Sequence, residues 1–190
     1  EENLNFGLIK SGCEIYRVGL GPTPMLYFAS HYYSADGAIQ VTGSHNPKNY
    51  NGFKIVLNQN SFYGEDIIKL GDFAKEGHST KNNGFSKNVD IYDRYIEKII
   101  EPIKSLSEKL SNKTIVWDCG NGASGPLVEM ITKKISGNHV VLYSKVDGNF
   151  PNHHPDPTDI STLKIMSNKM KEVSADIGIG FDGDGDRIGV

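Results

Sequence analysis

Apolar residues recur along the chain in two patterns, one with helical spacing and one with strand spacing. Tyrosines and isoleucines recur at helical intervals over residues 91–103, whereas apolar and polar residues alternate over 52–57. The same patterns predict further helices over 2–11, 125–135 and 159–171, one that begins near Thr23, and strands over 14–18, 37–42, 114–118, 139–143 and 176–181. Strands that alternate with helices are typical of α/β folds. We therefore predict two similar α/β units with mixed, largely parallel sheets flanked by helices.

A polar, glycine-punctuated stretch over residues 77–84 is the best boundary between the two units. We place the first unit at 1–88 and the second at 89–190. Thr23 is expected to cap the helix that follows it, with Pro24 in the first turn where a missing N–H is harmless.

Composition favours small-molecule chemistry. The 190 residues carry a formal net charge of only -3, and Lys and Arg are scattered, so neither a nucleic-acid surface nor a membrane patch is indicated. Cys13 and Cys119 are expected to be buried, reduced thiols. With no long apolar run and no basic start of a signal peptide, we expect a cytoplasmic protein.

Three carboxylates stand at alternate positions near the end of the sequence. Asp182, Asp184 and Asp186 are separated only by Gly183 and Gly185. In a straight strand these carboxylates are too far apart to share one ion, so the chain must curl, which glycine permits. Close carboxylates raise one another's pKa, and a bound divalent cation keeps all of them ionised. An all-oxygen set favours Mg²⁺, Ca²⁺ or Mn²⁺ over zinc.

A second candidate site lies in the turn over residues 42–47, with the sequence Thr-Gly-Ser-His-Asn-Pro. Taken alone, this segment fits a plain turn as well as it fits a reactive Ser44. Lys54, in the following strand, fits a solvated strand residue when judged by spacing alone. Gly120-Asn121-Gly122 is better explained as a tight strand-to-helix turn than as a phosphate-binding loop.

Four segments in one order carry a resemblance to a known family. They are 42–56, 116–122, 147–157 and the aspartate loop at 182–187. Together they strongly resemble the α-D-phosphohexomutases, and among them the bacterial phosphomannomutase/phosphoglucomutase branch. The resemblance runs through nearly all of the chain. It implies an isomerase of carbohydrate metabolism that interconverts hexose 1-phosphate and hexose 6-phosphate of mannose or glucose through a bisphosphorylated sugar.

The resemblance also assigns roles to individual residues. It implies that Ser44 is phosphorylated and that a phosphoserine oxygen and the three aspartates hold one Mg²⁺. It further implies proton transfer by Lys54, orientation by His45, and phosphate binding by Arg187 and Asn46. Glucose 1,6-bisphosphate or mannose 1,6-bisphosphate would be the phosphorylating activator.

Family members have four domains, so the resemblance makes this chain a fragment. It would hold the C-terminal part of domain 1, with the phosphoserine loop, and most of domain 2, with the metal loop. The remaining domains of the parent chain are then partners, and the oligomeric state stays open. Activity of this piece alone is a separate question.

The residues also allow three alternatives to be compared with the resemblance. The first is a divalent-metal-binding scaffold without turnover, and the second is a haloacid-dehalogenase-like phosphatase with Asp182 as nucleophile, which leaves Ser44 and Lys54 unexplained. An EF-hand fails because Arg187 occupies the required glycine position. His153 and His154 invite a zinc assignment, but no suitable spacing surrounds them, so we expect a structural loop role.

Overall fold

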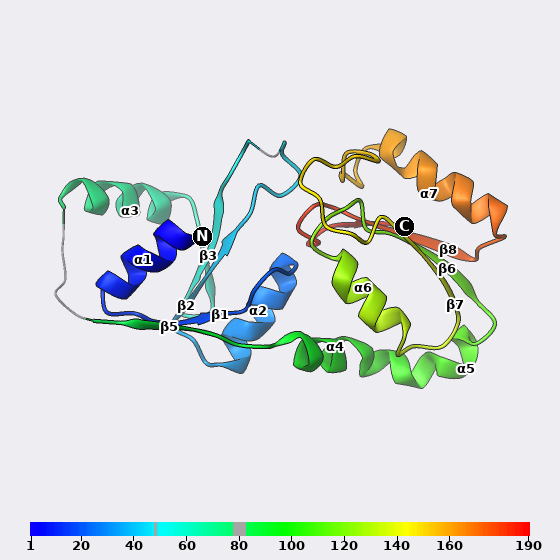
Figure 1. Ribbon diagram of the computed structural model, residues 1–190, viewed down its shortest axis with the longest axis horizontal. Helices are drawn as coiled ribbons and strands as arrows, with labels where there is room; N and C mark the ends of the chain where they lie inside the picture. Colours follow the sequence, from blue (N-terminus) through cyan, green and yellow to red (C-terminus); the bar gives the residue numbers. More distant parts are fainter. Residues whose placement is uncertain (48, 78–82) are drawn as a thin grey trace. The chain divides into compact units, whose positions relative to one another are not determined.

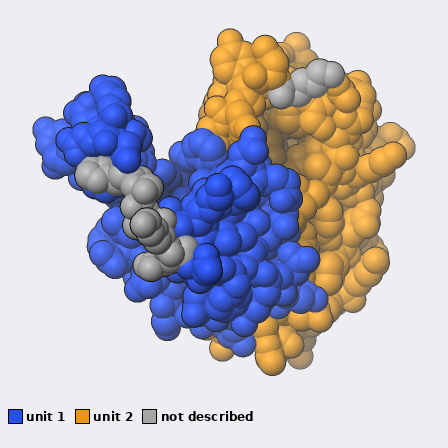
Figure 2. All heavy atoms as spheres, turned by 60° about the vertical axis from the view of Figure 1, so that its left-hand side comes forward, with its two compact units in different colours: residues 1–19, 26–41, 53–91 blue, residues 20–25, 42–52, 92–190 orange. Residues whose placement is uncertain are grey.

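The structure is a computed structural model that describes residues 1–47, 49–77 and 83–190. Two compact units are formed, each assembled from separate stretches of chain (Figure 2). Unit 1 comprises residues 1–19, 26–41 and 53–91, and unit 2 comprises residues 20–25, 42–52 and 92–190. The segment that carries Ser44 is therefore grouped with the C-terminal sheet, which also carries the aspartate loop.

Unit 2 is built on a four-stranded mixed sheet in its described part. The strand order is β7 (Asn138–Leu142), β6 (Thr114–Asp118), β8 (Ile177–Phe181) and β9 (Ile188–Gly189). β6 pairs in parallel with β7 and β8, whereas β9 turns back antiparallel to β8. β6 lies between two partners and buries Ile115 and Val116, as expected for a central parallel strand rich in β-branched residues.

Helices cover both faces of this sheet. Figure 1 shows α7 (Ile160–Glu172) on one side and α6 (Gly125–Thr132) with α4 (Tyr92–Ile100) on the other. A short 3-10 helix, Pro102–Leu106, and α5 (Ser107–Leu110) lead from α4 into β6. The Asp159 carboxylate caps α7 by accepting from the Ser161 N–H at 2.8 Å. Most of the buried apolar side chains lie in this unit: Met25, Ile96, Ile100, Ile115, Val116, Cys119, Leu127, Val128, Ile131 and Met166.

Unit 1 contains a parallel pair of strands and a three-stranded antiparallel sheet. β1 (Glu14–Arg17) pairs with β5 (Phe85–Asn88), and β3 (Phe53–Leu57) lies between β2 (Gly37–Val41) and β4 (Asn60–Phe62). Its helices are α1 (Glu2–Lys10), α3 (Glu65–Lys75) and most of α2 (Thr23–Tyr32). α3 leaves several large apolar residues exposed: Ile67, Ile68, Leu70 and Phe73.

The predicted fold class is confirmed, because mixed and parallel sheets are flanked by helices. One detail of the prediction is wrong: Cys13 is exposed, whereas Cys119 is buried as expected. Cys13 precedes β1 in the short link after α1. Most of the 77–84 stretch, residues 78–82, lies outside the described part of the chain. Among the described residues, no helix has the length and apolarity needed to span a bilayer.

Candidate functional site

The aspartate loop is the connection of a β-hairpin. β8 ends at Phe181, and β9 pairs back onto it with Phe181 opposite Ile188, so residues 182–187 form the turn, here called the aspartate hairpin. The hairpin brings carboxylate oxygens of Asp182, Asp184 and Asp186 within 4.8 Å of one another. The curl that the glycine spacing predicts is therefore present, and it gathers three oxygen ligands on one site.

Asp182 is the first residue of the aspartate hairpin and is fully buried. Its Oδ1 accepts from the backbone N–H groups of Asp186 and Arg187, each at 3.0 Å. Its Oδ2 accepts from Arg187 Nη2 at 3.0 Å and Nε at 3.1 Å. Burial raises the pKa of Asp182 above its ordinary value, the Arg187 N–H opposes this, and the charge of Asp184 adds to it. A positive charge close to Asp182 is thus needed to keep it ionised.

Asp184 is buried and is held by the start of α2. The Thr23 hydroxyl donates to Asp184 Oδ2 at 2.5 Å, and the Thr23 N–H donates to the Asp184 carbonyl at 2.8 Å. The prediction that Thr23 is a helix cap is therefore wrong. Thr23 is instead the first residue of α2, and the structure gives its hydroxyl the buried Asp184 carboxylate as a partner.

The hairpin glycines are required by close packing. A Cβ on Gly183 would lie 2.3 Å from the Ser44 carbonyl oxygen, and a Cβ on Gly185 would lie 2.2 Å from Ser124 Oγ. Gly185 also has a φ of +67°. The hairpin therefore presses directly against the backbone of the segment that carries Ser44.

Ser44 lies in a tight turn within unit 2. The Asn46 N–H donates to the Gly43 carbonyl at 2.9 Å, and the Ser44 N–H donates to Thr42 Oγ1 at 2.7 Å. Ser44 itself has a φ of +53°, which costs a non-glycine residue free energy. In this turn the Ser44 hydroxyl lies 3.4 Å from Asp182 Oδ2. The strained backbone thus aims the serine oxygen at the carboxylate cluster.

The neighbouring residues extend the site towards the loop at 153–158. His45 Nδ1 lies 3.1 Å from Asp156 Oδ2, and Arg187 Nη1 lies 3.6 Å from Asp156 Oδ1. The Thr158 hydroxyl holds the pKa of Asp156 below its ordinary value, with lesser help from His45 and Arg187. Asn46 is exposed, and its backbone closes the turn. Arg187 therefore lies between two carboxylates, Asp182 and Asp156.

Lys54 belongs to unit 1. It lies in β3 opposite Gln40 of β2 and is half-buried. On the same strand Phe53 and Leu57 are 56% and 46% exposed. A role for Lys54 in proton transfer stays a prediction.

The residues of the aspartate hairpin fit a hard divalent cation. Three carboxylates and the nearby serine hydroxyl provide only oxygen donors, which Mg²⁺ and Ca²⁺ prefer. Ser44, Asp182, Asp184 and Asp186 would hold the ion. Since Arg187 now donates to Asp182 Oδ2, an ion bound there has to share or replace that contact.

The two adjacent histidines have separate environments. His153 Nε2 lies 2.9 Å from Asp118 Oδ2, and its Nδ1 lies 2.9 Å from the His154 carbonyl. The hydrogen bond with buried Asp118 raises the pKa of His153. His154 instead lies beside His45, with ring centroids 6.0 Å apart. The structural loop role expected for His154 stays a prediction.

The Gly120-Asn121-Gly122 turn packs closely against the backbone of the aspartate hairpin. The Ala123 N–H donates to the Gly183 carbonyl at 2.9 Å, and a Cβ on Gly122 would lie 2.7 Å from the same oxygen. Sequence reasoning did not assign three residues that shape the site to it: Asp156 received no role, and Thr23 and His154 received other roles. Only the motif His153-His154-Pro155-Asp156 gave a signal for two of them.

Comparison with known proteins places these features in a family. The family model described as phosphoglucomutase/phosphomannomutase, alpha/beta/alpha domain I, matches residues 1–71, and the model for domain II matches residues 93–190. The phosphomannomutase/phosphoglucomutase of Pseudomonas syringae pv. tomato is 44% identical over 97% of this chain. The phosphoglucomutase of Neisseria gonorrhoeae is 38% identical over the whole chain.

A solved structure agrees with these matches. A phosphoglucomutase/phosphomannomutase family protein from Burkholderia thailandensis superposes with a TM-score of 0.87 and 37% identity over 98% of this chain. The match covers 42% of that protein, and the two curated relatives are covered to 39% and 41%. The chain thus spans about two fifths of the length of the relatives it matches.

Proposed function

Because the chain belongs to the phosphoglucomutase/phosphomannomutase family, we propose that it carries the phosphoryl-accepting serine and the cation site of a hexose phosphate mutase. The parent enzyme would interconvert hexose 1-phosphate and hexose 6-phosphate, with mannose or glucose as the sugar. Transfer would pass through phosphorylated Ser44 and a bisphosphorylated sugar. The full cycle would use the remaining domains of the parent chain, since the relatives are longer.

One observation carries the proposal: the Ser44 hydroxyl lies 3.4 Å from Asp182 Oδ2, at the edge of three clustered carboxylates. A serine oxygen beside bare carboxylates is a poor place for a phosphoryl group because the negative charges repel. The same position is favourable once a divalent cation lies between them, since catalysis of phosphoryl transfer rests mainly on positioning and electrostatics.

In the proposed transfer, a sugar hydroxyl oxygen attacks the phosphorus on Ser44. The bond from phosphorus to Ser44 Oγ breaks, and the hydroxyl proton passes to the neutral amine of Lys54. Asp182, Asp184, Asp186 and a phosphoserine oxygen would hold the cation, which would supply the positive charge that offsets the charge of the phosphoryl group during transfer. The activator glucose 1,6-bisphosphate or mannose 1,6-bisphosphate would load Ser44 by the reverse step.

Arg187 and His45 would position the phosphoryl group. The Arg187 guanidinium already donates two N–H groups to Asp182 Oδ2, and the same planar fork fits phosphoryl oxygens. His45 is held by Asp156 Oδ2 at 3.1 Å, which fixes its ring next to Ser44. Asn46 closes the turn through its backbone and would contribute to phosphate binding.

The test is intact-mass spectrometry with peptide mapping after incubation with glucose 1,6-bisphosphate and Mg²⁺. Comparison with Ser44→Ala identifies the acceptor, and Asp184→Asn tests the need for the cation site. We expect one phosphate on Ser44 that requires Mg²⁺ and is absent from both variants.

Other outcomes point to the alternatives. Mg²⁺ binding without a phosphate would support a metal-binding scaffold that lacks turnover. A phosphate on Asp182 that hydroxylamine removes would contradict the mutase and support a phosphatase of the haloacid-dehalogenase type.

A further inference from the structure

A second cluster of metal-ligating side chains lies outside the aspartate hairpin. Ligand atoms of His45, His154 and Asp156 all lie within 4.8 Å of one another. We propose that these three residues form a second cation site, specific for a borderline transition-metal ion such as Zn²⁺. The proposal concerns binding and is independent of the proposed phosphoryl transfer.

The distances suit direct coordination. Zinc bonds to imidazole nitrogen and to carboxylate oxygen are each about 2.0–2.2 Å long, so two such ligands at a tetrahedral ion are about 3.4 Å apart. His45 Nδ1 and Asp156 Oδ2 already lie 3.1 Å apart. The third ligand lies within 4.8 Å of the other two, so it needs a movement of at most about 1.4 Å to reach the same spacing. His154 can make it because its side chain is exposed.

The carboxylate is held in the orientation that such an ion requires. Asp156 Oδ1 accepts from the Thr158 hydroxyl at 2.7 Å and from the Thr158 N–H at 3.1 Å. Arg187 also approaches Oδ1, at 3.6 Å, so Oδ2 is the oxygen that faces His45. Partners of this kind orient metal ligands and strengthen their binding. The positive charge of Arg187 is balanced by its contact with Asp182.

The donor set separates this cluster from the aspartate hairpin. Two imidazoles and one carboxylate suit zinc and its neighbours, whereas Mg²⁺ prefers an octahedral set of oxygens. Three protein ligands also leave a fourth position open, as in zinc sites that bind water or substrate. The two sites should therefore select different ions from a mixture.

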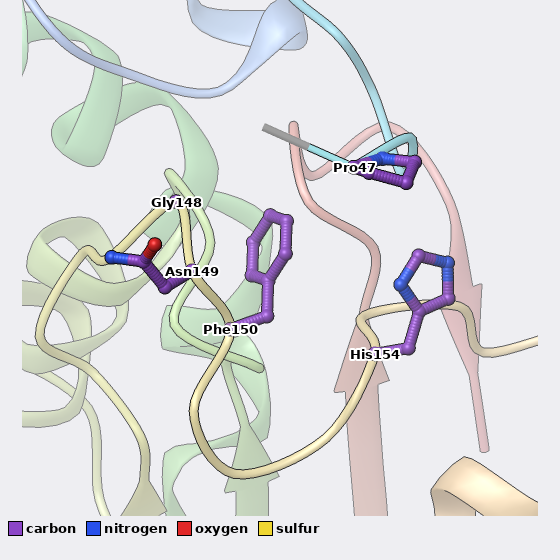
Figure 3. Close-up of a pocket in the computed structure, with 5 residues that line it drawn as sticks. All are labelled: Pro47, Gly148, Asn149, Phe150 and His154. Atoms are coloured by element: carbon purple, nitrogen blue, oxygen red, sulfur yellow. The ribbon is translucent and has the colours of Figure 1, made fainter. Parts of the chain in front are cut away.

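The cluster is reachable from solvent. His154 lines a pocket of about 280 Å³ together with Pro47, Gly148, Asn149 and Phe150. Figure 3 shows the Phe150 and His154 rings beside this pocket with Pro47 above them. The two rings meet edge to face, with centroids 6.3 Å apart. An ion can thus approach His154 without the core opening.

The experiment is a Zn²⁺ titration of the 190-residue chain in excess Mg²⁺, followed by calorimetry, with Co²⁺ absorption spectra to report the ligand geometry. We expect one Zn²⁺ that Mg²⁺ does not displace. His154→Ala and Asp156→Asn should each weaken its binding by about tenfold or more. His31→Ala, which removes an exposed histidine from α2, should leave it unchanged. Circular dichroism of the metal-free variants checks that each is folded.

Two outcomes would overturn the proposal. If Zn²⁺ binding survives in both His154→Ala and Asp156→Asn but is lost in Asp184→Asn, the ion occupies the aspartate hairpin. If the folded wild-type chain binds no Zn²⁺ in excess Mg²⁺, the contact of His45 with Asp156 is only an ion pair. Retention of Zn²⁺ by Asp184→Asn would support two separate sites.

Discussion

Arg187 donates hydrogen bonds to both oxygens of the Asp182 carboxylate. Its backbone N–H donates to Oδ1 at 3.0 Å, while its guanidinium Nη2 donates to Oδ2 at 3.0 Å. Asp182 is fully buried, so the guanidinium is the positive charge that offsets this carboxylate when no cation is bound. Arg187 and a bound cation therefore serve the same electrostatic need.

Arg187→Ala should make stability depend more strongly on divalent cations. Without Mg²⁺, we expect the free energy of unfolding to fall by about 2 kcal/mol, because a buried carboxylate loses its charged donors. Added Mg²⁺ should restore most of this loss by binding the folded state. Urea unfolding with and without Mg²⁺ measures both values.

The matched control for this prediction is Arg94→Ala. Arg94 lies 3.5 Å from Glu97 on the surface of α4, so its loss should change stability by less than about 0.5 kcal/mol. An equal loss for Arg187→Ala in the presence and absence of Mg²⁺ would contradict the shared role.

The positive φ of Ser44 predicts that glycine stabilises this turn. Both Ser44→Gly and Ser44→Ala remove the hydroxyl, so their difference isolates the backbone. Relief of about 1–2 kcal/mol of strain should exceed the entropy that glycine loses on folding, about 0.4–1 kcal/mol. We expect Ser44→Gly to be the more stable by about 0.5–1 kcal/mol in thermal unfolding. A more stable alanine variant would mean that the turn stores no strain.

Gly183→Ala should loosen the contact between the hairpin and the serine turn. The added Cβ would lie 2.3 Å from the Ser44 carbonyl, so the backbone must move, at a cost of about 1–3 kcal/mol. Mg²⁺ affinity, measured by calorimetry, should fall as well. Gly148→Ala is the control, because its Cβ meets no atom within 4 Å. Equal effects of both substitutions would rule out the packing explanation.

The contacts of Asp176 predict that unit 2 loses part of its stability at acidic pH. The Lys113 ammonium, 2.7 Å away, and the Thr114 N–H hold the pKa of Asp176 below its ordinary value. A lowered pKa in the folded state stabilises the protein above the unfolded value of about 3.9, and this benefit is lost as the pH falls through the folded value.

The measurement for Asp176 is denaturant unfolding over a range of pH. Asp176→Asn should be less stable than wild type at pH 7, and the gap should close as the pH is lowered below the folded pKa. The control is Asp93→Asn, which changes a carboxylate that is 70% exposed and 3.8 Å from Lys134, so the free energy of unfolding at pH 7 should change by less than about 0.5 kcal/mol. A gap that stays constant with pH would count against the Asp176 assignment.

The sequence predicted elements well where the pattern was local and strong. β6 and α4 have continuous or periodic apolar positions, and both were found. α3, β4 and β5 were not predicted. β4 has three residues, and β5 forms by pairing in parallel with β1, about 70 residues away, so neither leaves a periodic signal of its own.

The candidate site likewise has one part that local sequence predicts and one part that it does not. The aspartate hairpin could be predicted because its three carboxylates and two glycines are adjacent in sequence. The contact between Thr23 and Asp184 joins residues 161 positions apart, and that between His45 and Asp156 depends on two loops meeting. Such pairings arise from tertiary packing, so neither segment alone has a sequence pattern that predicts them.

The chain passes between its two units five times, after residues 19, 25, 41, 52 and 91. A single break in the gene therefore cannot separate them. Expressed as two polypeptides split after residue 88, one product would carry Ser44 and the other the three aspartates. Under the proposed function, phosphoryl transfer to Ser44 beside the cation site would return only when the two halves reassociate, so its recovery would report fragment complementation.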